Sequence, residues 1–130
     1  MRTPTTADLH RLAAEQVVWL CTLRPDGSPH LTPVWFCYLG ESWWISSASR
    51  NVKVANLAKD PRVSLALTDG DRPVVAEGTA DFHHGTYPDD VTAAFVDKYG
   101  GWDITDHVTE GPRVLIRVRT RRWLLTGSAT

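Results

Sequence analysis

Five or six short strand-like segments, joined by tight turns, constrain the fold of this 130-residue chain more than any other feature. The stretch Arg24-Pro25-Asp26-Gly27-Ser28 has the residues of a hairpin turn between the first two segments. No regular strand–helix–strand alternation and no GxGxxG motif occur, which argues against a dinucleotide-binding fold. Because closure removes exposed sheet edges, we expect one domain over residues 1–130, a mostly β (α+β) antiparallel barrel, closed or half-closed. Its strands are expected at residues 17–23, 30–39, 42–47, 63–68, 74–83 and 114–126.

Helices are expected at the ends of the chain's β segments and at one crossing between them. Thr5-x-x-Asp8 resembles a capping box and predicts a helix within residues 3–16. A short helix is expected over residues 50–59, before Asp60-Pro61. A longer helix is expected from Thr86-x-x-Asp89 to the Gly100-Gly101 stop. His83 and His84, at the end of the preceding strand, are expected on opposite faces.

Composition excludes several classes of function. The formal charge of −1 gives no basic field for nucleic acid. No apolar run of membrane-spanning length and no secretory leader is evident. Cys21 and Cys37 lie in apolar strand patterns and are expected to be buried, reduced thiols, which favours a cytoplasmic protein. Six tryptophans suit either a protein interface or a ring-binding pocket.

No side-chain constellation for acid–base or covalent catalysis stands out. The five histidines lack the spacing of a metal site, and there is no GxSxG motif. Paired carboxylates fall at turns and helix starts, where capping explains them. We therefore predict no catalytic side chain and no metal, so that in an enzyme a cofactor would supply the chemistry.

A candidate anion site lies where the third strand ends and the short helix begins. Ser46, Ser47 and Ser49 precede the short helix, which is expected to open with Arg50 and Lys53; lying three apart, these two cations are expected to share a face. Helix N-terminal N–H groups, hydroxyls and two cations together suit a phosphate. The alternative is an ordinary solvated basic face.

Four segments carry a family resemblance: TLRPDGSPHLTPVWF (22–36), KVANLAKDPRVSLAL (53–67), VVAEGTADF (74–82) and GPRVLIRVRTRRW (111–123). In this order they resemble the pyridoxamine 5′-phosphate oxidase-like FMN/F-420-binding split-barrel superfamily, especially its small actinobacterial branch of F-420-dependent enzymes. The resemblance implies a six-stranded split β-barrel with flanking helices. It also implies a homodimer with two cofactor sites at its interface.

The resemblance implies a phosphate end and a ring end for each site. Arg50 and Lys53 would hold the cofactor phosphate with help from the two nearest serines, and residues 32–35 would lie against the flavin-like ring. Trp123 would reach the partner's site. The implied cofactor-binding residues are Thr32, Pro33, Val34, Trp35, Ser46, Ser47, Arg50, Lys53 and Trp123.

The implied function is an oxidoreductase that uses reduced coenzyme F-420 to pass hydride to a small planar or conjugated substrate. A proton could come from Tyr38, Tyr87 or His83. One alternative is an FMN-dependent oxidoreductase, and another is a non-catalytic flavin- or haem-binding protein. A basic groove for the F-420 tail would favour the first reading, with candidates Arg24, Lys59, Arg62 and Arg72.

Two departures from the family pattern bear on this reading. Many relatives carry a second basic residue just before the motif lysine, where this chain has Val52. The chain also lacks the C-terminal Arg/His substrate signature of true pyridoxamine phosphate oxidases. We therefore do not expect oxidation of vitamin B6.

Overall fold

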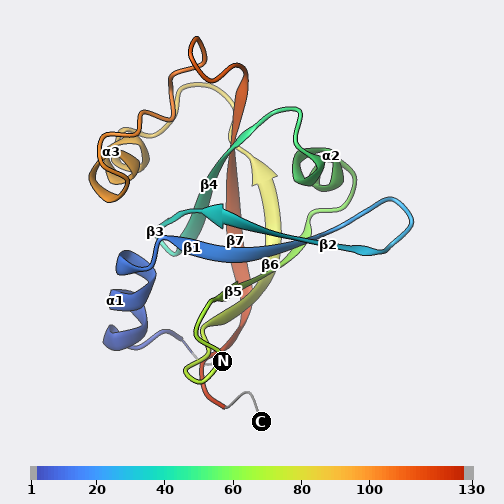
Figure 1. Ribbon diagram of the computed structural model, residues 1–130. Helices are drawn as coiled ribbons and strands as arrows, with labels where there is room; N and C mark the ends of the chain where they lie inside the picture. Colours follow the sequence, from blue (N-terminus) through green and yellow to red (C-terminus); the bar gives the residue numbers. More distant parts are fainter. Residues whose placement is uncertain (1–2, 128–130) are drawn as a thin grey trace.

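An antiparallel seven-stranded sheet forms most of the computed structural model, which describes residues 3–127 (Figure 1). The strand order is β2-β1-β5-β6-β7-β4-β3, and three helices lie against the sheet. The expected mostly β fold is confirmed as a half-barrel. The elements are α1 (Thr6–Ala14), β1 (Val17–Leu23), β2 (Pro29–Trp35), β3 (Cys37–Leu39), β4 (Ser42–Ala48), α2 (Val52–Lys59), β5 (Arg62–Leu67), β6 (Val75–Phe82), α3 (Asp89–Lys98) and β7 (Arg113–Leu124).

The strand count differs from the expected six because the segment 30–39 breaks at Phe36. β2 pairs with β1, whereas β3 pairs with β4 at the other edge of the sheet. The Phe36 side chain is fully buried, and its N–H donates to the Tyr99 hydroxyl at 2.9 Å. One continuous segment therefore supplies both edge strands and turns the sheet into a half-barrel.

Two hydrophobic clusters lie on the two faces of the sheet. The larger cluster fills the inner face, with Trp43 and Phe36 as its largest fully buried side chains, and it includes Leu57 of α2. Asn56 of α2 donates to Thr22 of β1 at 3.0 Å, and both side chains are buried. The second cluster joins α3 to the outer face of β3, β4 and β7. Figure 1 shows α2 and α3 on opposite sides of the sheet.

The helix starts agree in part with expectation. Thr5 caps α1 as predicted: Asp8 N–H donates to Thr5 Oγ1 at 3.1 Å, and Thr5 N–H donates to Asp8 at 2.9 Å. α2 begins at Val52 rather than at Arg50, since Asn51 is its N-cap and its N–H returns to the Ala48 carbonyl. The prediction that Arg50 and Lys53 share a helical face is therefore wrong.

The third helix and its approach also differ from expectation. α3 starts at Asp89 with Pro88 as N-cap, so Thr86 is not its cap. β6 ends at Phe82, so His83 and His84 lie in the following loop rather than on opposite faces of a strand. His83 Nε2 instead lies 2.9 Å from the Thr86 carbonyl oxygen.

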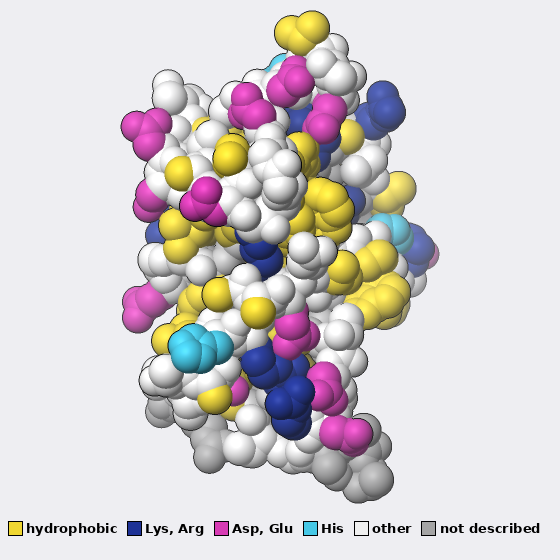
Figure 2. All heavy atoms as spheres, turned by 60° about the vertical axis from the view of Figure 1, so that its left-hand side comes forward, with side chains coloured by type: hydrophobic (Ala, Val, Ile, Leu, Met, Phe, Trp, Pro, Cys, Tyr) yellow, Lys and Arg dark blue, Asp and Glu magenta, His cyan; other side chains and the backbone are white. Residues whose placement is uncertain are grey.

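The chain has two cysteines, Cys21 in β1 and Cys37 in β3. Both thiols are free; Cys37 is buried as expected, but Cys21 is half-buried on the outer face of β1. Figure 2 shows the side of α1 and α3, where acidic and basic side chains are interspersed with hydrophobic ones.

No helix within residues 3–127 is long and apolar enough to cross a membrane. The same residues contain no group of His, Cys, Asp and Glu side chains arranged for a metal ion.

Candidate functional site

A pocket of about 230 Å³ lies where β2 and β4 end and where α2 and β7 begin. Three of the residues predicted to contact a ring and three predicted near a phosphate converge here from separate elements. Ala48 and Asn51, which are close to these residues in sequence, and Trp102 and Arg113, from the later part of the chain, complete its wall. The lining residues are Pro33, Val34, Trp35, Ser46, Ser47, Ala48, Asn51, Lys53, Trp102 and Arg113.

A wider, more open hollow of about 700 Å³ adjoins this pocket and shares Trp35, Ala48, Trp102 and Arg113 with it. Arg50 lines the hollow, exposed to solvent, together with residues 99–101 and Glu110. Arg50 and Lys53 thus face two connected spaces. Together these spaces offer a cationic end and an aromatic wall.

The aromatic wall is built around Trp35, whose side chain is 47% exposed. Its ring stacks on Tyr99 with centroids 4.4 Å apart and meets Trp102 edge-on at 5.4 Å. Tyr99 is fixed by its hydroxyl, which accepts from Phe36 N–H and donates to the Gln16 carbonyl at 2.6 Å. The wall therefore presents a flat aromatic surface in a defined orientation.

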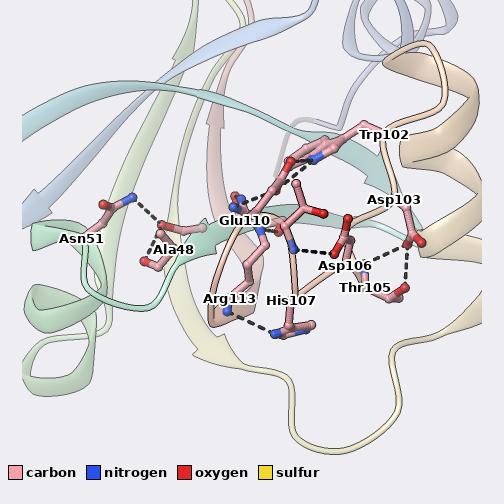
Figure 3. Close-up of polar contacts among 12 residues, drawn as sticks. Ala48, Asn51, Trp102, Asp103, Thr105, Asp106, His107, Glu110 and Arg113 are labelled. Carbon is pink, nitrogen blue, oxygen red and sulfur yellow. Dashed lines mark hydrogen bonds and ion pairs between the residues drawn. The ribbon is translucent and has the colours of Figure 1, made fainter.

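The end of β4 supplies two serines with separate partners (Figure 3 shows this region). Ser47 Oγ donates to the Ala48 carbonyl at 3.2 Å and accepts from Asn51 Nδ2 at 3.0 Å. This leaves Asn51 without a side-chain hydrogen bond to the first turn of α2. Val54 N–H already donates to the Asn51 carbonyl at 3.0 Å, whereas the N–H groups of Val52 and Lys53 have no acceptor among residues 3–127 and remain able to donate toward an anion.

Arg113 is a site residue that the sequence reasoning missed. From the first position of β7 its Nε donates to Ser46 Oγ at 2.9 Å, and Nη2 donates to the Ser46 carbonyl at 3.2 Å. The guanidinium lies 5.3 Å from the Trp102 ring, a cation–π arrangement. Arg113 lies in segment 111–123, which carries part of the family resemblance. The alternation of residues along that strand does not show that β7 begins beside Ser46.

Lys53 faces the same pocket from the first turn of α2. Burial, and then the positive charge of Arg113, lower the pKa of Lys53 below its ordinary value. Two cations close enough to repel each other favour an anion placed between them. The lowered pKa of Lys53 therefore points to an anion site, and it arises from the folded arrangement of Lys53 and Arg113 rather than from the local sequence.

Two predicted cofactor residues line neither the pocket nor the adjoining hollow. Thr32 lies on β2 opposite Leu20, half-buried on the inner face, while its neighbours 33–35 reach the pocket. Trp123 packs against Trp43 and Tyr38 with centroid distances of 5.9 Å each, and lines a separate hollow beside Ser42, where β4 begins. Its predicted reach into a partner's site concerns an assembly and stays a prediction.

None of the cations considered for a tail groove lines the pocket or the hollow: Arg24, Lys59 and Arg62 lie where β1 ends and β5 begins, and Arg72 lies beyond the other end of β5. Arg24 holds the Pro29 carbonyl at 2.7 Å in the β1–β2 turn, and Arg62 pairs with Asp60 at 2.7 Å. Arg72 lies in the β5–β6 turn beside α1, where its carbonyl accepts from Arg11. Lys59 is exposed at the last turn of α2.

The three candidate proton donors lie outside both spaces. Tyr38 lines the hollow near Trp123, and burial raises its pKa. Tyr87 and His83 pack edge to face at 6.3 Å on the outer side near α3. Apart from arginine, the titratable side chains among the lining residues that the structure describes are Lys53, Tyr99 and Glu110.

Comparison with known proteins identifies the family. Residues 5–127 match the pyridoxamine 5′-phosphate oxidase family. The chain belongs to this family. Curated proteins gave no match.

Solved structures of this family's fold extend over nearly the whole chain. Conserved hypothetical protein Rv2991 from Mycobacterium tuberculosis is 27% identical with a TM-score of 0.74, covering 98% of this chain and 93% of that one. An F420 reductase is 25% identical with a TM-score of 0.70, covering 94% and 98%. HutZ, the haem storage protein of Vibrio cholerae, is 14% identical with a TM-score of 0.75, covering 97% of each, and shows similarity of fold alone.

Proposed function

We propose that this chain binds reduced coenzyme F-420 and serves as an oxidoreductase toward a small planar or conjugated substrate. The observation that carries the proposal is a pocket that brings Lys53 and Arg113 together with the exposed ring of Trp35. A tricyclic ring that carries a phosphate matches both ends of the pocket, because the phosphate suits the cations and the ring suits the aromatic wall. The whole-chain similarity to an F420 reductase supports the deazaflavin.

The residues present fit such a cofactor. Lys53 and Arg113 would hold the phosphate, and Arg50 would add charge from the adjoining hollow. Pro33 and Val34 present edge-strand backbone toward the ring's polar rim. When bound, the deazaflavin supplies a hydride; the protein's part is to orient the ring and to exclude water from one face.

We also propose that the chain forms a homodimer, with the cofactor sites at its interface. Paired residues form one apolar row across five strands of the outer face, in the order Pro33, Trp19, Ala66, Val75 and Leu124. Trp19 is 40% and Leu124 56% exposed, and Leu31 beside the row is 61% exposed. A contiguous exposed apolar surface of this kind suits a protein partner, and it extends to Trp35 at the pocket.

A titration of the purified protein with F-420 and with FMN, followed by tryptophan fluorescence, tests the cofactor. We expect quenching by F-420, because Trp35 and Trp102 line the pocket. Tight FMN binding without F-420 binding would contradict the deazaflavin and favour the FMN alternative. Haem binding with no turnover of any flavin would support the non-catalytic alternative.

A double variant tests the phosphate end of the site. Arg50→Ala with Lys53→Ala should weaken binding of the phosphorylated cofactor by roughly tenfold or more. Arg119→Ala with Arg122→Ala removes the same charge from exposed positions of β7 that line neither space, and is the matched control. Equal affinities of the two double variants would exclude Arg50 and Lys53 from phosphate binding.

A further inference from the structure

Glu110 connects the two ends of the loop between α3 and β7. Its carboxylate accepts from Trp102 Nε1 at 3.1 and 3.3 Å and pairs with Arg113 Nη1 at 3.1 Å (Figure 3). The loop between them is further held by Asp103, which accepts from Thr105, and by His107 Nδ1, which accepts from Arg113 N–H at 3.2 Å. Glu110 and His107 thus both join this loop to Arg113, and Glu110 is the one that meets its guanidinium.

The charges around Glu110 are not balanced. Among the described residues that line the two connected spaces, three are cations, Arg50, Lys53 and Arg113, and Glu110 is the one carboxylate. Arg113 is mostly buried, with 12% of its side chain exposed, whereas Glu110 is 35% exposed. A partly exposed carboxylate binds its cation weakly in water. A phosphate group offers a second charge and more acceptor oxygens to the same guanidinium.

Arg113 is held in place independently of Glu110. Nε and Nη2 bond to Ser46, while Nη1 alone meets Glu110. The guanidinium can therefore exchange the partner of Nη1 without losing its position. An incoming anion that takes this partner leaves Glu110 held by Trp102 Nε1 alone, so the environment of that indole N–H changes.

We propose that Glu110 is a built-in competitor for the ligand's phosphate: the phosphate displaces Glu110 from Arg113, and the contact between Glu110 and Trp102 Nε1 changes as it does so. The identity of the ligand rests on the proposed function, but the exchange at Arg113 does not. Glu110 then sets how strongly a ligand must be charged to bind: a phosphorylated ligand must displace it from Arg113, whereas an uncharged counterpart binds without that cost.

The test titrates inorganic phosphate into the full chain and follows the indole N–H signals by two-dimensional NMR. Trp102→Phe assigns the Trp102 signal. We expect phosphate to shift this signal in the wild type, to bind Glu110→Gln about threefold to fivefold more tightly, and to lose its effect in Arg113→Gln. Asp103→Asn, in the same loop and without contact to Arg113, should behave like the wild type.

A second readout uses FMN and riboflavin, which differ by the phosphate. Glu110→Gln should tighten FMN binding and leave riboflavin unchanged. Equal phosphate affinities of wild type and Glu110→Gln, or no phosphate response in either, would overturn the inference. Failure of F-420 and FMN to bind, with the phosphate response intact, would overturn the proposed function and keep the exchange at Arg113.

Discussion

Trp35 and Tyr99 stack almost in parallel, with ring centroids 4.4 Å apart and planes inclined by 7°, although they come from β2 and from the C-cap of α3. Burial raises the pKa of Tyr99 to about 12, so its hydroxyl stays protonated at neutral pH. The same hydroxyl accepts from Phe36 N–H at the break between β2 and β3. The orientation of the pocket's aromatic wall is therefore coupled to the corner that shapes the half-barrel.

Tyr99→Phe should lower the free energy of unfolding by about 1–3 kcal/mol, because the Phe36 N–H loses its acceptor in a buried position. The stacked ring remains, so ring-cofactor affinity should fall less than stability does. Urea unfolding measures the first quantity. Tyr87→Phe is the control, since the Tyr87 hydroxyl has no hydrogen bond among residues 3–127. Equal stability of the two variants would show that the corner does not depend on this hydroxyl.

Local sequence signals predicted the elements well where the determinants were local. The Thr5–Asp8 capping box and the β1–β2 turn are examples. The break at Phe36 was missed because apolar residues continue through Trp35, Phe36 and Cys37 with no turn signal. Only the pairing of β2 with β1 and of β3 with β4 divides the segment.

The candidate site shows the same division. Ser46, Ser47 and Lys53 were found because they are neighbours in sequence at a strand–helix junction. Arg113 was missed because its position beside Ser46 depends on the pairing of β4 with β7, in which Ala48 lies opposite Arg113. A contact made by sheet register between distant segments has no signature in a single sequence.

Lys98 should make stability rise with pH in alkaline solution. Its Nζ donates to the Phe36 carbonyl at 2.9 Å and lies 3.7 Å from the Phe36 ring centroid, and burial lowers its pKa to about 8. From about pH 8 to the ordinary value of 10.5 the unfolded chain binds the extra proton, so the free energy of unfolding increases with pH. Below pH 8 the full cost of the buried charge is present.

Lys98→Met should remove this rise, as measured by urea unfolding at a series of pH values. Cys37 and Tyr99 act in the opposite direction, because burial raises their pKa values to about 11 and about 12. The comparison is therefore made in a Cys37→Ala background, where the coupling between Lys98 and the thiol is absent. Lys59→Met, at an exposed position, is the control. Identical pH slopes with and without Lys98 would refute the assignment.

Gly78→Ala should destabilise the chain by roughly 1–3 kcal/mol. A Cβ at Gly78 would collide with the Arg119 backbone carbonyl, where the β6–β7 register shifts between Glu77 and Gly78. Backbone on a neighbouring strand cannot yield as a flexible side chain can, so the bulge would have to distort. Thr79→Ala, one residue on, should cost less than about 1 kcal/mol by thermal unfolding. A Gly78→Ala variant as stable as Thr79→Ala would show that the bulge is adaptable.

Trp19→Asp should convert the proposed homodimer into a monomer. Trp19 is central to the apolar row, paired with Pro33 on one side and with Ala66 on the other, and 40% of its side chain is exposed. A carboxylate there would be desolvated in both copies of a symmetric interface, which costs far more than the lost apolar contact alone.

Light scattering coupled to size exclusion measures the outcome, with a chain mass of 14.5 kDa as the unit. Val108→Asp is the matched control, because Val108 is 97% exposed on the 102–112 loop and lies outside the apolar row. If the sites lie at the interface, Trp19→Asp should lose cofactor affinity together with dimer mass, although Trp19 lines neither of the connected spaces. A monomeric wild type would contradict the dimer, and a monomeric variant with full affinity would place the site within one chain.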